Sequence, residues 1–439
     1  MHGAHAVYFY RPASVSVVVR VHKPALSPID ETSLPQPEAA GVSVVRLRRL
    51  TTALRADADQ AVIPGAVLLI VRNDHLVAFE AFGHLDAALQ RPMHKDSIFR
   101  IASMTKPLTV AAALTFMEEG KLLLNDPVSR YLPEFAQMTV GIERGDPASG
   151  EHRLGVEPAL HAMTIQDLMR HTAGFTYGQF GDSLVQRAYR DARLIDDQQT
   201  NAEMAAKLAR LPLAHQPGTT FEYGMSTDVL GRVVEVIAGC GLDRVLAERI
   251  TGPLGMKDTA FGIQPRQQHR LAEPLRDSQT GGGIVMIPYD PARTAKWFSG
   301  GGGLVSTAAD YLRFTQMLLN DGEFGGERLL ARHTVRLMLA NHLPAGLNYG
   351  PRTSDLGLAA PLPRLGQGYG LGLGVRTHEA LGAVPGLVGD FYWGGALGPY
   401  FWVDRAEGLI VIFMLQELSL QRRARYRSLL RTLVYQALR

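Results

Sequence analysis

The first candidate for chemistry is Ser103, the only serine in the chain that stands three residues before a lysine, Lys106. The pair opens an apolar, alanine-rich stretch that is typical of a buried helix. On a helix, residues three apart share a face, with about 5–6 Å between their Cβ atoms. A lysine shielded from water can lose its charge and take the proton of a serine hydroxyl. The spacing therefore predicts a serine nucleophile with an amine partner; the alternative is a helix N-terminus with a surface lysine.

The segments around this pair favour the first interpretation. Residues 99–107 (FRIASMTKP) resemble the nucleophile region of serine β-lactamases and penicillin-binding proteins. More closely, they resemble the ester-cleaving relatives of those enzymes, the class C β-lactamase-like or family VIII carboxylesterases. The resemblance extends from about residue 60 to the C-terminus. Further segments agree with it in order: residues 119–122, 126–128, 168–174, 217–218, 228–231, 253–256 and 393–395.

Tyr223, in the segment FEYGMS, matches the tyrosine that begins the second motif of this family. By the resemblance, its phenol shares the proton of Ser103 with Lys106 and returns it to the leaving alcohol. Whether Lys106 or Tyr223 is the first base stays open, because two such groups are expected to titrate as a coupled pair. An isolated tyrosine would be interpreted as a core residue, and the flanking segments favour catalysis instead.

The segment WGGA at residues 393–396 matches the third motif of the family. Gly394 and Gly395 are expected to let a substrate approach the backbone of a strand closely. By the resemblance, the backbone N–H groups of Ala396 and Ser103 form the oxyanion hole. Trp393 would then border the substrate. The alternative interpretation of Trp393 is a core aromatic residue on a buried strand.

Two departures from the β-lactamase pattern bear on the substrate. Met225 stands where the second motif of β-lactamases has asparagine, and Trp393 stands where their third motif has lysine. That asparagine binds the substrate amide, and the lysine offers a charge to the carboxylate of the antibiotic. Methionine and tryptophan do neither, and they are expected to form an apolar wall that binds substrate. The departures favour an esterase over a penicillinase.

The chain is therefore predicted to be a cofactor-independent serine hydrolase that cleaves small, mainly apolar carboxylic esters through an acyl-enzyme. Weak β-lactam turnover stays open, because Ser103, Lys106 and Tyr223 are all present. The nearest alternatives use the same site as a β-lactamase, a D-amino-acid peptidase or an acyltransferase. An alternative of a different class is a non-catalytic ligand-binding member of the family, which the three reactive side chains disfavour.

Composition limits the partners. The formal charge of +3 is small for 439 residues, and lysine and arginine are scattered, so nucleic acid is not expected as a partner. No apolar run approaches the roughly 20 residues that cross a bilayer, so no membrane is expected either. The absence of an H-E-x-x-H motif or a spaced Cys/His cluster predicts no metal. The expected partner is a small ester substrate, and the oligomeric state stays open.

The single cysteine, Cys240, excludes an intrachain disulfide and fits a reducing compartment. Residues 13–19 are too short and too polar for a convincing signal peptide. We therefore expect a cytoplasmic protein. Residues 1–41, which include a proline-rich stretch, are predicted to be an N-terminal extension that could be flexible.

Apolar periodicity divides the rest of the chain. It predicts helices at residues 44–61 and 420–438, a hairpin at 66–71 and 76–82, and strands at 369–375, 388–393, 399–403 and 409–415. Residues 136–162 and 172–200 lack periodicity and are predicted to be loops. The glycine run at 299–303 lacks a following Gly-Lys-Ser/Thr and is predicted to be a close-packed turn, and His171 and His215 are predicted to be structural.

The order of these elements predicts an α/β fold of the α+β type. Residues 42–99 and 345–439 are expected to form an antiparallel sheet flanked by terminal helices. Residues 100–344 are expected to form an inserted all-helical domain that carries the nucleophile helix. The family resemblance implies the same β-lactamase/penicillin-binding-protein-like architecture, with the active site at the interface of the two parts.

Overall fold

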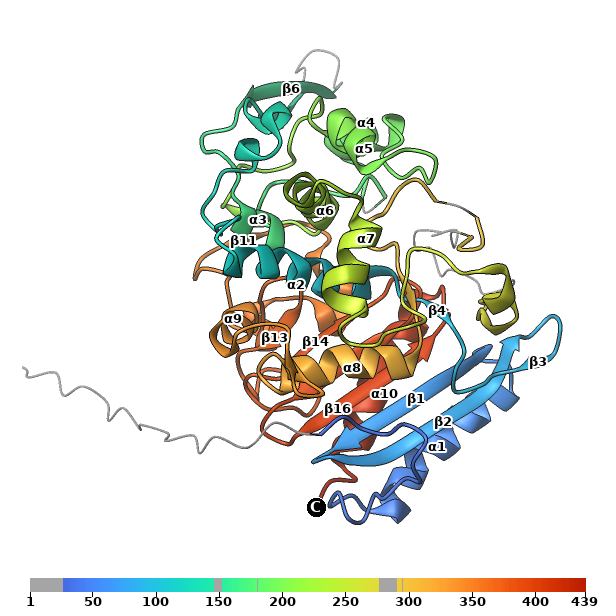
Figure 1. The fold of residues 1–439 in the computed structure, drawn as a ribbon. Helices are drawn as coiled ribbons and strands as arrows, with labels where there is room; N and C mark the ends of the chain where they lie inside the picture. Colours follow the sequence, from blue (N-terminus) through green and yellow to red (C-terminus); the bar gives the residue numbers. More distant parts are fainter. Residues whose placement is uncertain (1–26, 146–151, 180, 276–289, 294) are drawn as a thin grey trace, which may run out of the picture.

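An eight-stranded antiparallel sheet forms the centre of the molecule (Figure 1). The computed structural model describes residues 27–145, 152–179, 181–275, 290–293 and 295–439. The strands lie side by side in the order β12 (Gln367–Tyr369), β13 (Gly374–Arg376), β14 (Phe391–Gly394), β15 (Tyr400–Asp404), β16 (Leu409–Leu415), β1 (Gly65–Arg72), β2 (His75–Asp86) and β3 (Arg91–Pro92).

The two middle strands come from opposite ends of the sequence. β1 pairs with β16 from Ala66 opposite Leu415 to Arg72 opposite Leu409. Every residue of both strands is buried, as expected for strands that are covered on both faces. The predicted hairpin is confirmed, and β1 turns into β2 at Asn73 and Asp74, whose φ values of 48° and 65° suit a tight two-residue turn.

Helices cover both faces of this sheet. α1 (Val44–Asp59) packs against α10 (Leu420–Tyr435), and Tyr426 of α10 contacts Phe413 of β16, with ring centres 6.1 Å apart. On β15, Phe401 instead contacts Tyr311 of α8 (Ala308–Leu319) at 5.0 Å. Phe413 pairs with Tyr400, and successive side chains alternate between faces, so α8 and α10 lie on opposite faces. The predicted sheet flanked by terminal helices is confirmed.

The remaining helices form most of the region above α8 in Figure 1. α2, which follows Ser103, is buried along nearly its whole length and contacts α6 and α7. α8 falls within the range predicted as the helical domain, yet it packs on β1 and β16. The helices of this region are α2 (Thr105–Glu118), α3 (Ile165–Met169), α4 (Leu184–Asp191), α5 (Asn201–Leu208), α6 (Ser226–Ala238), α7 (Leu242–Leu246) and α9 (Arg332–Met338).

The inserted region is not wholly helical. A hairpin of β5 (Thr139–Gly145) and β6 (His152–Pro158) lies where a loop was predicted. Each strand has only two alternating apolar residues, and most of the hairpin is exposed or half-buried, so the strand signal in the sequence is weak. The predicted strand at 369–375 is divided into β12 and β13 by a turn with Gly372 at φ 81°. The other short strands are β4 (Phe99–Arg100), β7 (Thr220–Phe221), β8 (Val305–Ser306), β9 (Glu323–Phe324), β10 (Glu327–Arg328) and β11 (Asn348–Tyr349).

The described part of the predicted N-terminal extension lies against the folded body. The amide of Gln36 donates to the carbonyl of Leu76 at 2.7 Å, and Arg313 of α8 pairs with Glu31 at 3.0 Å. Residues 27–41 therefore contact the folded body, and the flexibility of the extension 1–41 stays a prediction. Residues 13–19, considered as a signal peptide, lie outside the described residues. Within the described residues, none of the helices has the length and apolar character required to cross a membrane.

Candidate active site

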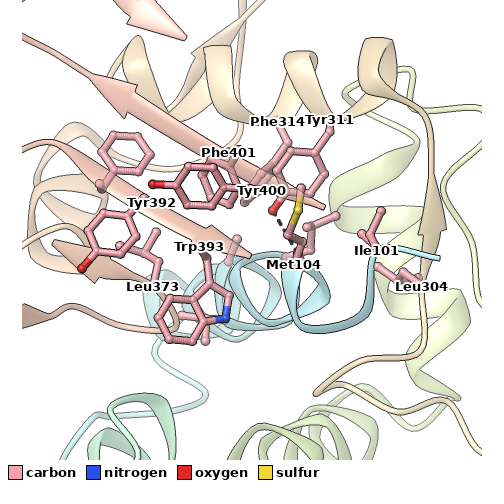
Figure 2. Close-up of a cluster of buried hydrophobic side chains, with 14 of the residues drawn as sticks. Ile101, Met104, Leu304, Tyr311, Phe314, Leu373, Tyr392, Trp393, Tyr400 and Phe401 are labelled. Atoms are coloured by element: carbon pink, nitrogen blue, oxygen red, sulfur yellow. Dashed lines mark hydrogen bonds between the residues drawn. The ribbon is translucent and has the colours of Figure 1, made fainter. Parts of the chain in front are cut away.

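Ser103 lies on a strained turn that leads directly into α2. The turn is a short 3-10 helix, Ala102–Met104, and Ala102 has a φ of 44°, a region that alanine seldom adopts. Ile101 and Met104 are fully buried on either side of it, and the Tyr311 hydroxyl donates to the Met104 carbonyl at 2.9 Å (Figure 2). The buried flanks hold the turn in place and leave Ser103 half-buried.

The amine of Lys106 lies beside this serine. Its Nζ atom is 3.2 Å from the Oγ of Ser103, 3.2 Å from the hydroxyl of Tyr177 and 2.7 Å from the carbonyl of Gly301. Lys106 is 0% exposed, and Nζ also lies 4.6 Å from the ring centre of Tyr223. An ammonium group has three N–H donors, and each of them has an acceptor here. The structure thus brings Ser103, Lys106 and Tyr223 together.

The carbonyl of Gly301 comes from the glycine run, which packs tightly beside α2. A Cβ atom on Gly301 would lie 2.4 Å from the carboxylate of Asp228, and one on Gly300 would lie 2.7 Å from the carbonyl of Thr227. Asp228 in turn accepts hydrogen bonds from the Ser299 hydroxyl at 2.5 Å and the Gly301 amide at 3.1 Å. The run is therefore the close-packed turn that was predicted, and it also places an acceptor for the lysine, which was not predicted.

Asp228 brings a carboxylate near the lysine. It is 2% exposed, and burial raises the pKa of this carboxyl, while the positive charge of Lys106 lowers it in part. Asp228 acts on the amine through Gly301. The amide of Gly301 donates to Asp228, and the carbonyl of Gly301 accepts from Lys106. Asp228 therefore fixes the turn that orients the amine.

Tyr177 is a site residue that the sequence analysis missed. It lies in the range assigned to a loop, six residues after His171, and its ring centre is 5.7 Å from that of Tyr223. The segments that carry the two tyrosines pack backbone against backbone: a Cβ on Gly224 would lie 2.3 Å from the carbonyl of Phe175. The sequence did contain one signal for Tyr177, which is that it closely follows the family segment at residues 168–174 on a glycine-containing loop.

Burial keeps Tyr177 in its phenol form. Burial raises the pKa of Tyr177 well above its usual value of about 10, and the negative charge of Asp228 raises it further. A phenol that keeps its proton cannot act as the base that deprotonates Ser103. Tyr177 therefore accepts a hydrogen bond from Lys106 and holds the amine in place.

His171 and His215 both support the tyrosine segments. His171 is fully buried with a φ of 58°, and its ring centre lies 4.7 Å from that of Tyr223. Burial lowers the pKa of this imidazole, and the charge of Lys106 lowers it further, so His171 is neutral. The Nε2 atom of His215 lies 3.4 Å from Glu222, which accepts a hydrogen bond from Thr176 at 2.7 Å.

The end of β14 packs on the nucleophile turn. Trp393 is 1% exposed, and its ring lies 5.5 Å from that of Tyr223 and 5.1 Å from that of Tyr369 (Figure 2 shows Trp393 beside Met104). A Cβ on Gly395 would lie 2.5 Å from the carbonyl of Ile101. The close approach that Gly395 permits in the structure is thus to the protein's own backbone, and approach by a substrate stays a prediction.

Gly394 and Met225 are also held by contacts within the protein. A Cβ on Gly394 would lie 2.5 Å from the guanidinium of Arg427. Met225 is 1% exposed at the start of α6, where its carbonyl accepts from the amides of Asp228 and Val229. Ala396 is half-buried. The roles of Met225 and Trp393 in substrate binding stay predictions, because both side chains are packed inside the protein.

The described residues were also compared with the residue types that bind metal ions. Within those residues, His, Cys, Asp and Glu side chains do not gather in a group of three or more that could hold a metal ion. The groups that gather around the amine of Lys106 are instead the hydroxyl of Ser103, the phenol of Tyr177, the ring of Tyr223 and the carbonyl of Gly301. A hydroxyl, a phenol and an amine can transfer protons between one another.

Comparison with known proteins identifies the family. The family model described as "Beta-lactamase" matches residues 48–436. Protein Rv1367c of Mycobacterium tuberculosis is 38% identical over 367 residues, which cover 83% of this chain and 88% of that protein. Esterase EstB of Burkholderia gladioli is 30% identical over 391 residues, which cover 82% of this chain and 90% of EstB.

A solved structure agrees with these sequence matches. EstCE1, described as a hydrolase with promiscuous acyltransferase activity, superposes with a TM-score of 0.71 and 28% sequence identity, covering 89% of this chain and 99% of EstCE1. The predicted β-lactamase/penicillin-binding-protein-like fold is therefore confirmed. Because the family match spans most of the chain and EstB and EstCE1 align over nearly their full lengths, the chain belongs to the beta-lactamase family, consistent with its family VIII carboxylesterase branch.

Proposed function

We propose that this protein hydrolyses small, mainly apolar carboxylic esters through an acyl-enzyme on Ser103. Its family and its esterase-named relatives support the reaction class, a serine hydrolase that acts on carboxylic esters. One observation carries the assignment of the site. The Oγ atom of Ser103 lies 3.2 Å from the amine of a lysine that is wholly buried, on a turn whose flanks are fixed by the core.

The geometry supports a two-step reaction. Ser103 Oγ bonds to the ester carbonyl carbon, and its proton passes to the pair formed by Lys106 and Tyr223. When the tetrahedral intermediate collapses, the bond to the alcohol oxygen breaks and that oxygen takes the proton. Water then repeats the sequence on the acyl-enzyme, releases the acid and returns the proton to Ser103. Tyr177 and Gly301 keep the amine aimed at the serine.

Two backbone amides are proposed as the oxyanion hole. In the described residues, no hydrogen bond from the N–H of Ser103 or of Ala396 to a protein oxygen is found, so both donors are left for a ligand. Their segments touch, since Gly395 packs on the carbonyl of Ile101. Removing one such donor in other enzymes costs about 2.7–4 kcal/mol of transition-state stabilisation.

The preference for apolar esters rests on the two departures from the β-lactamase motifs. Trp393 and Met225 replace a lysine and an asparagine that would bind a charged, amide-bearing antibiotic. Both side chains are buried, the ring of Trp393 lies 5.5 Å from that of Tyr223, and neither side chain carries a charge or an amide group. A slow side reaction with β-lactams is part of the proposal, because the reactive groups are retained.

The first test is hydrolysis of p-nitrophenyl butyrate and of nitrocefin, side by side, by the wild type and by Ser103→Ala. We expect fast ester cleavage that is lost in Ser103→Ala and slow or absent nitrocefin turnover. The matched control is Ser354→Ala, which removes an exposed hydroxyl and should leave both rates unchanged. Labelling with a fluorophosphonate and mass spectrometry of the peptide should place the modification on Ser103.

Other outcomes point to other assignments. Fast nitrocefin turnover would identify a β-lactamase, and cleavage of D-amino-acid peptides in preference to esters would identify a peptidase. Ester cleavage that survives in Ser103→Ala would refute the nucleophile. A folded protein that the fluorophosphonate fails to label would be a ligand-binding member of the family.

Acyl transfer is the second candidate, favoured by the description of EstCE1 as a hydrolase with promiscuous acyltransferase activity. An alcohol that outcompetes water for the acyl-enzyme would show as a new ester product when it is added to the hydrolysis reaction. Hydrolysis that exceeds transfer at each alcohol concentration would leave the esterase as the principal activity.

The cytoplasmic location stays a prediction, which fractionation of cells expressing the protein would test.

A further inference from the structure

Glu222, the residue before Tyr223, carries a buried carboxylate that takes no direct part in the proposed reaction. The residue is 5% exposed, so its charged group is almost wholly removed from water. A charge buried in this way is costly unless the protein supplies hydrogen bonds to it. An apolar side chain would fill the same space without that cost, so the partners of Glu222 indicate what its charge does.

The shortest contact of this carboxylate joins the segments of the two tyrosines. The hydroxyl of Thr176, a residue that is 0% exposed, donates to the Oε1 atom of Glu222 at 2.7 Å. Thr176 directly precedes Tyr177, just as Glu222 directly precedes Tyr223. A hydrogen bond from a hydroxyl to a carboxylate is roughly twice as strong as one between neutral groups. The bond therefore fixes the two segments to each other one residue ahead of each phenol.

The two segments also touch on the other side of Tyr223. A Cβ atom on Gly224 would lie 2.3 Å from the carbonyl of Phe175. The ring centres of Tyr177 and Tyr223 are 5.7 Å apart. The Nζ atom of Lys106 lies 5.6 Å from the first ring centre and 4.6 Å from the second. A change in the spacing of the two segments would therefore move both phenols relative to the amine.

Further contacts hold the carboxylate itself in place. The Nε2 atom of His215, whose ring is half-buried, lies 3.4 Å from the Oε2 atom of Glu222. Gly350 follows β11, which pairs with β7, and its amide donates to the carbonyl of Phe221 at 2.9 Å. A Cβ atom on Gly350 would lie 1.6 Å from Oε2, so a larger residue there would displace the carboxylate. Separate parts of the chain thus converge on Glu222.

We propose that Glu222 is a positioning residue for the reaction. Its carboxylate sets the spacing of the segments that carry Tyr177 and Tyr223, and thereby places both phenols against the amine of Lys106. The inference rests on the proposed function and adds a residue that acts through the two tyrosines, without contact with the substrate. A displacement of about 1 Å among such groups can lower a rate by about 10²-fold.

The test separates the hydroxyl of Thr176 from the space that its side chain fills. Thr176→Val removes the hydroxyl and keeps the shape, whereas Thr176→Ser keeps the hydroxyl and loses a buried methyl group. Both changes should lower the melting temperature. We expect kcat for p-nitrophenyl butyrate to fall about ten- to a hundredfold in Thr176→Val, with KM little changed, and to stay within about threefold of the wild type in Thr176→Ser.

The matched control is Thr259→Val. Thr259 is also buried, and its hydroxyl donates to a carboxylate, that of Asp310, at 2.9 Å. Its loss should lower the melting temperature and leave kcat close to the wild-type value. A folded Thr176→Val protein with the kcat of the wild type, or an equal loss of kcat in Thr176→Val and Thr176→Ser, would overturn the positioning role.

A second variant covers the case in which Thr176→Val does not fold. Gly350→Ala keeps every polar side chain and displaces the carboxylate of Glu222, because the new Cβ would lie 1.6 Å from Oε2. It should also lower kcat with KM little changed. An unchanged kcat in folded Gly350→Ala would equally overturn the role of Glu222.

The positioning role and the esterase can be told apart when one of them fails. Ester cleavage that survives in Ser103→Ala would refute the proposed function and the positioning role with it. Cleavage that is lost in Ser103→Ala and unchanged in Thr176→Val would refute the positioning role alone. The rate at which a fluorophosphonate labels Ser103 should fall in Thr176→Val by the same factor as kcat, because labelling also requires loss of the serine proton.

Discussion

On the side of Ser103 that faces the helical region, Lys106 has an acceptor for each proton of its amine, all supplied by the protein itself. On the other side, at the corner where β14 meets α10, Arg423 donates to the carbonyl of Ala396 and Arg427 lies over the ring of Tyr400 at 5.4 Å. Among the described residues, neither arginine forms an ion pair with a carboxylate. Lys106 is wholly buried and the two arginines are half-buried. Only the lysine has a hydrogen-bond acceptor for each of its N–H groups.

The difference follows from the task of Lys106. A group that moves protons in every turnover needs fixed geometry before the substrate arrives, and the contacts of Lys106 provide it. The two arginines have no part in the proposed reaction, and the Nε atom of Arg427 has no hydrogen-bond partner among the described residues. Completeness of hydrogen bonding therefore distinguishes the proposed catalytic amine from the charges on α10.

The largest expected effect on activity comes from removing the amine of Lys106. Lys106→Met should lower kcat for p-nitrophenyl butyrate by about 10³-fold, within the 10²–10⁴-fold typical of positioned acid–base groups. The measurement is steady-state kinetics, with circular dichroism as a check on folding. Lys121→Met, which changes an exposed lysine just beyond α2, is the control and should keep the wild-type rate. A Lys106→Met rate within tenfold of wild type would contradict the role of the amine.

The second prediction compares paired and unpaired arginines on one helix. Arg431→Met leaves the buried Asp390 without one of its partners and should lower the free energy of unfolding by about 3–5 kcal/mol. Arg427→Met removes an unpaired charge and should raise the free energy of unfolding by about 1 kcal/mol. Urea unfolding of both variants tests this. Equal destabilisation would mean that Arg427 is as well partnered as Arg431.

The third prediction concerns the turn that orients the lysine. In Gly301→Ala the new Cβ would lie 2.4 Å from Asp228, so the turn must shift, and we expect a loss of about 1–3 kcal/mol of stability together with a lower kcat. Gly302→Ala is the matched control, because its Cβ would meet no atom closer than 3.8 Å. Thermal melts and kinetics on both variants should separate them, and two equal melting temperatures would argue against tight packing at Gly301.

The smallest expected effect is on pH dependence. Burial and then the charge of Lys106 lower the pKa of His171, whereas an unfolded histidine titrates near about 6.5. The stability that neutral His171 contributes is complete above that value and is lost as the pH falls below it, by at most about 1.4 kcal/mol per pH unit.

Urea unfolding between pH 7.5 and pH 5 should therefore show a flatter pH dependence in His171→Asn than in the wild type. Asparagine is chosen because it tolerates the positive φ of 58° at this position. His161→Asn, at an exposed site, is the control and should keep the wild-type slope. An unchanged slope in His171→Asn would show that another group dominates this pH range.

The sequence predicted those parts of the molecule that side-chain patterns encode. Apolar periodicity located α1, the β1–β2 hairpin, β16 and α10, and the order of these elements indicated the sheet with its insertion. Ser103 and Lys106 were predicted because helical spacing alone brings them together. Tyr223 required the family motif, since the two tyrosine segments meet only through tertiary packing.

The rest could not be predicted because it depends on backbone groups or on distant contacts. The acceptor at Gly301 is a carbonyl, which every residue has, and it lies far along the chain from Lys106. Tyr177 meets the lysine across a loop without periodicity. Whether Arg427 forms an ion pair depends on which acidic residues lie near α10 in the folded protein. The arginine-rich sequence of the helix does not show this.

The pairing of β1 with β16 has a consequence for how the chain acquires its structure during synthesis. β1 is made before the helical region, but β16, the strand that pairs with it in the middle of the sheet, is made only after that whole region. Until then, one edge of β1 offers open backbone hydrogen-bonding groups to other chains. Pairing between such distant segments is also slow. The rate at which β16 emerges and docks therefore governs how long the nascent protein is exposed to aggregation.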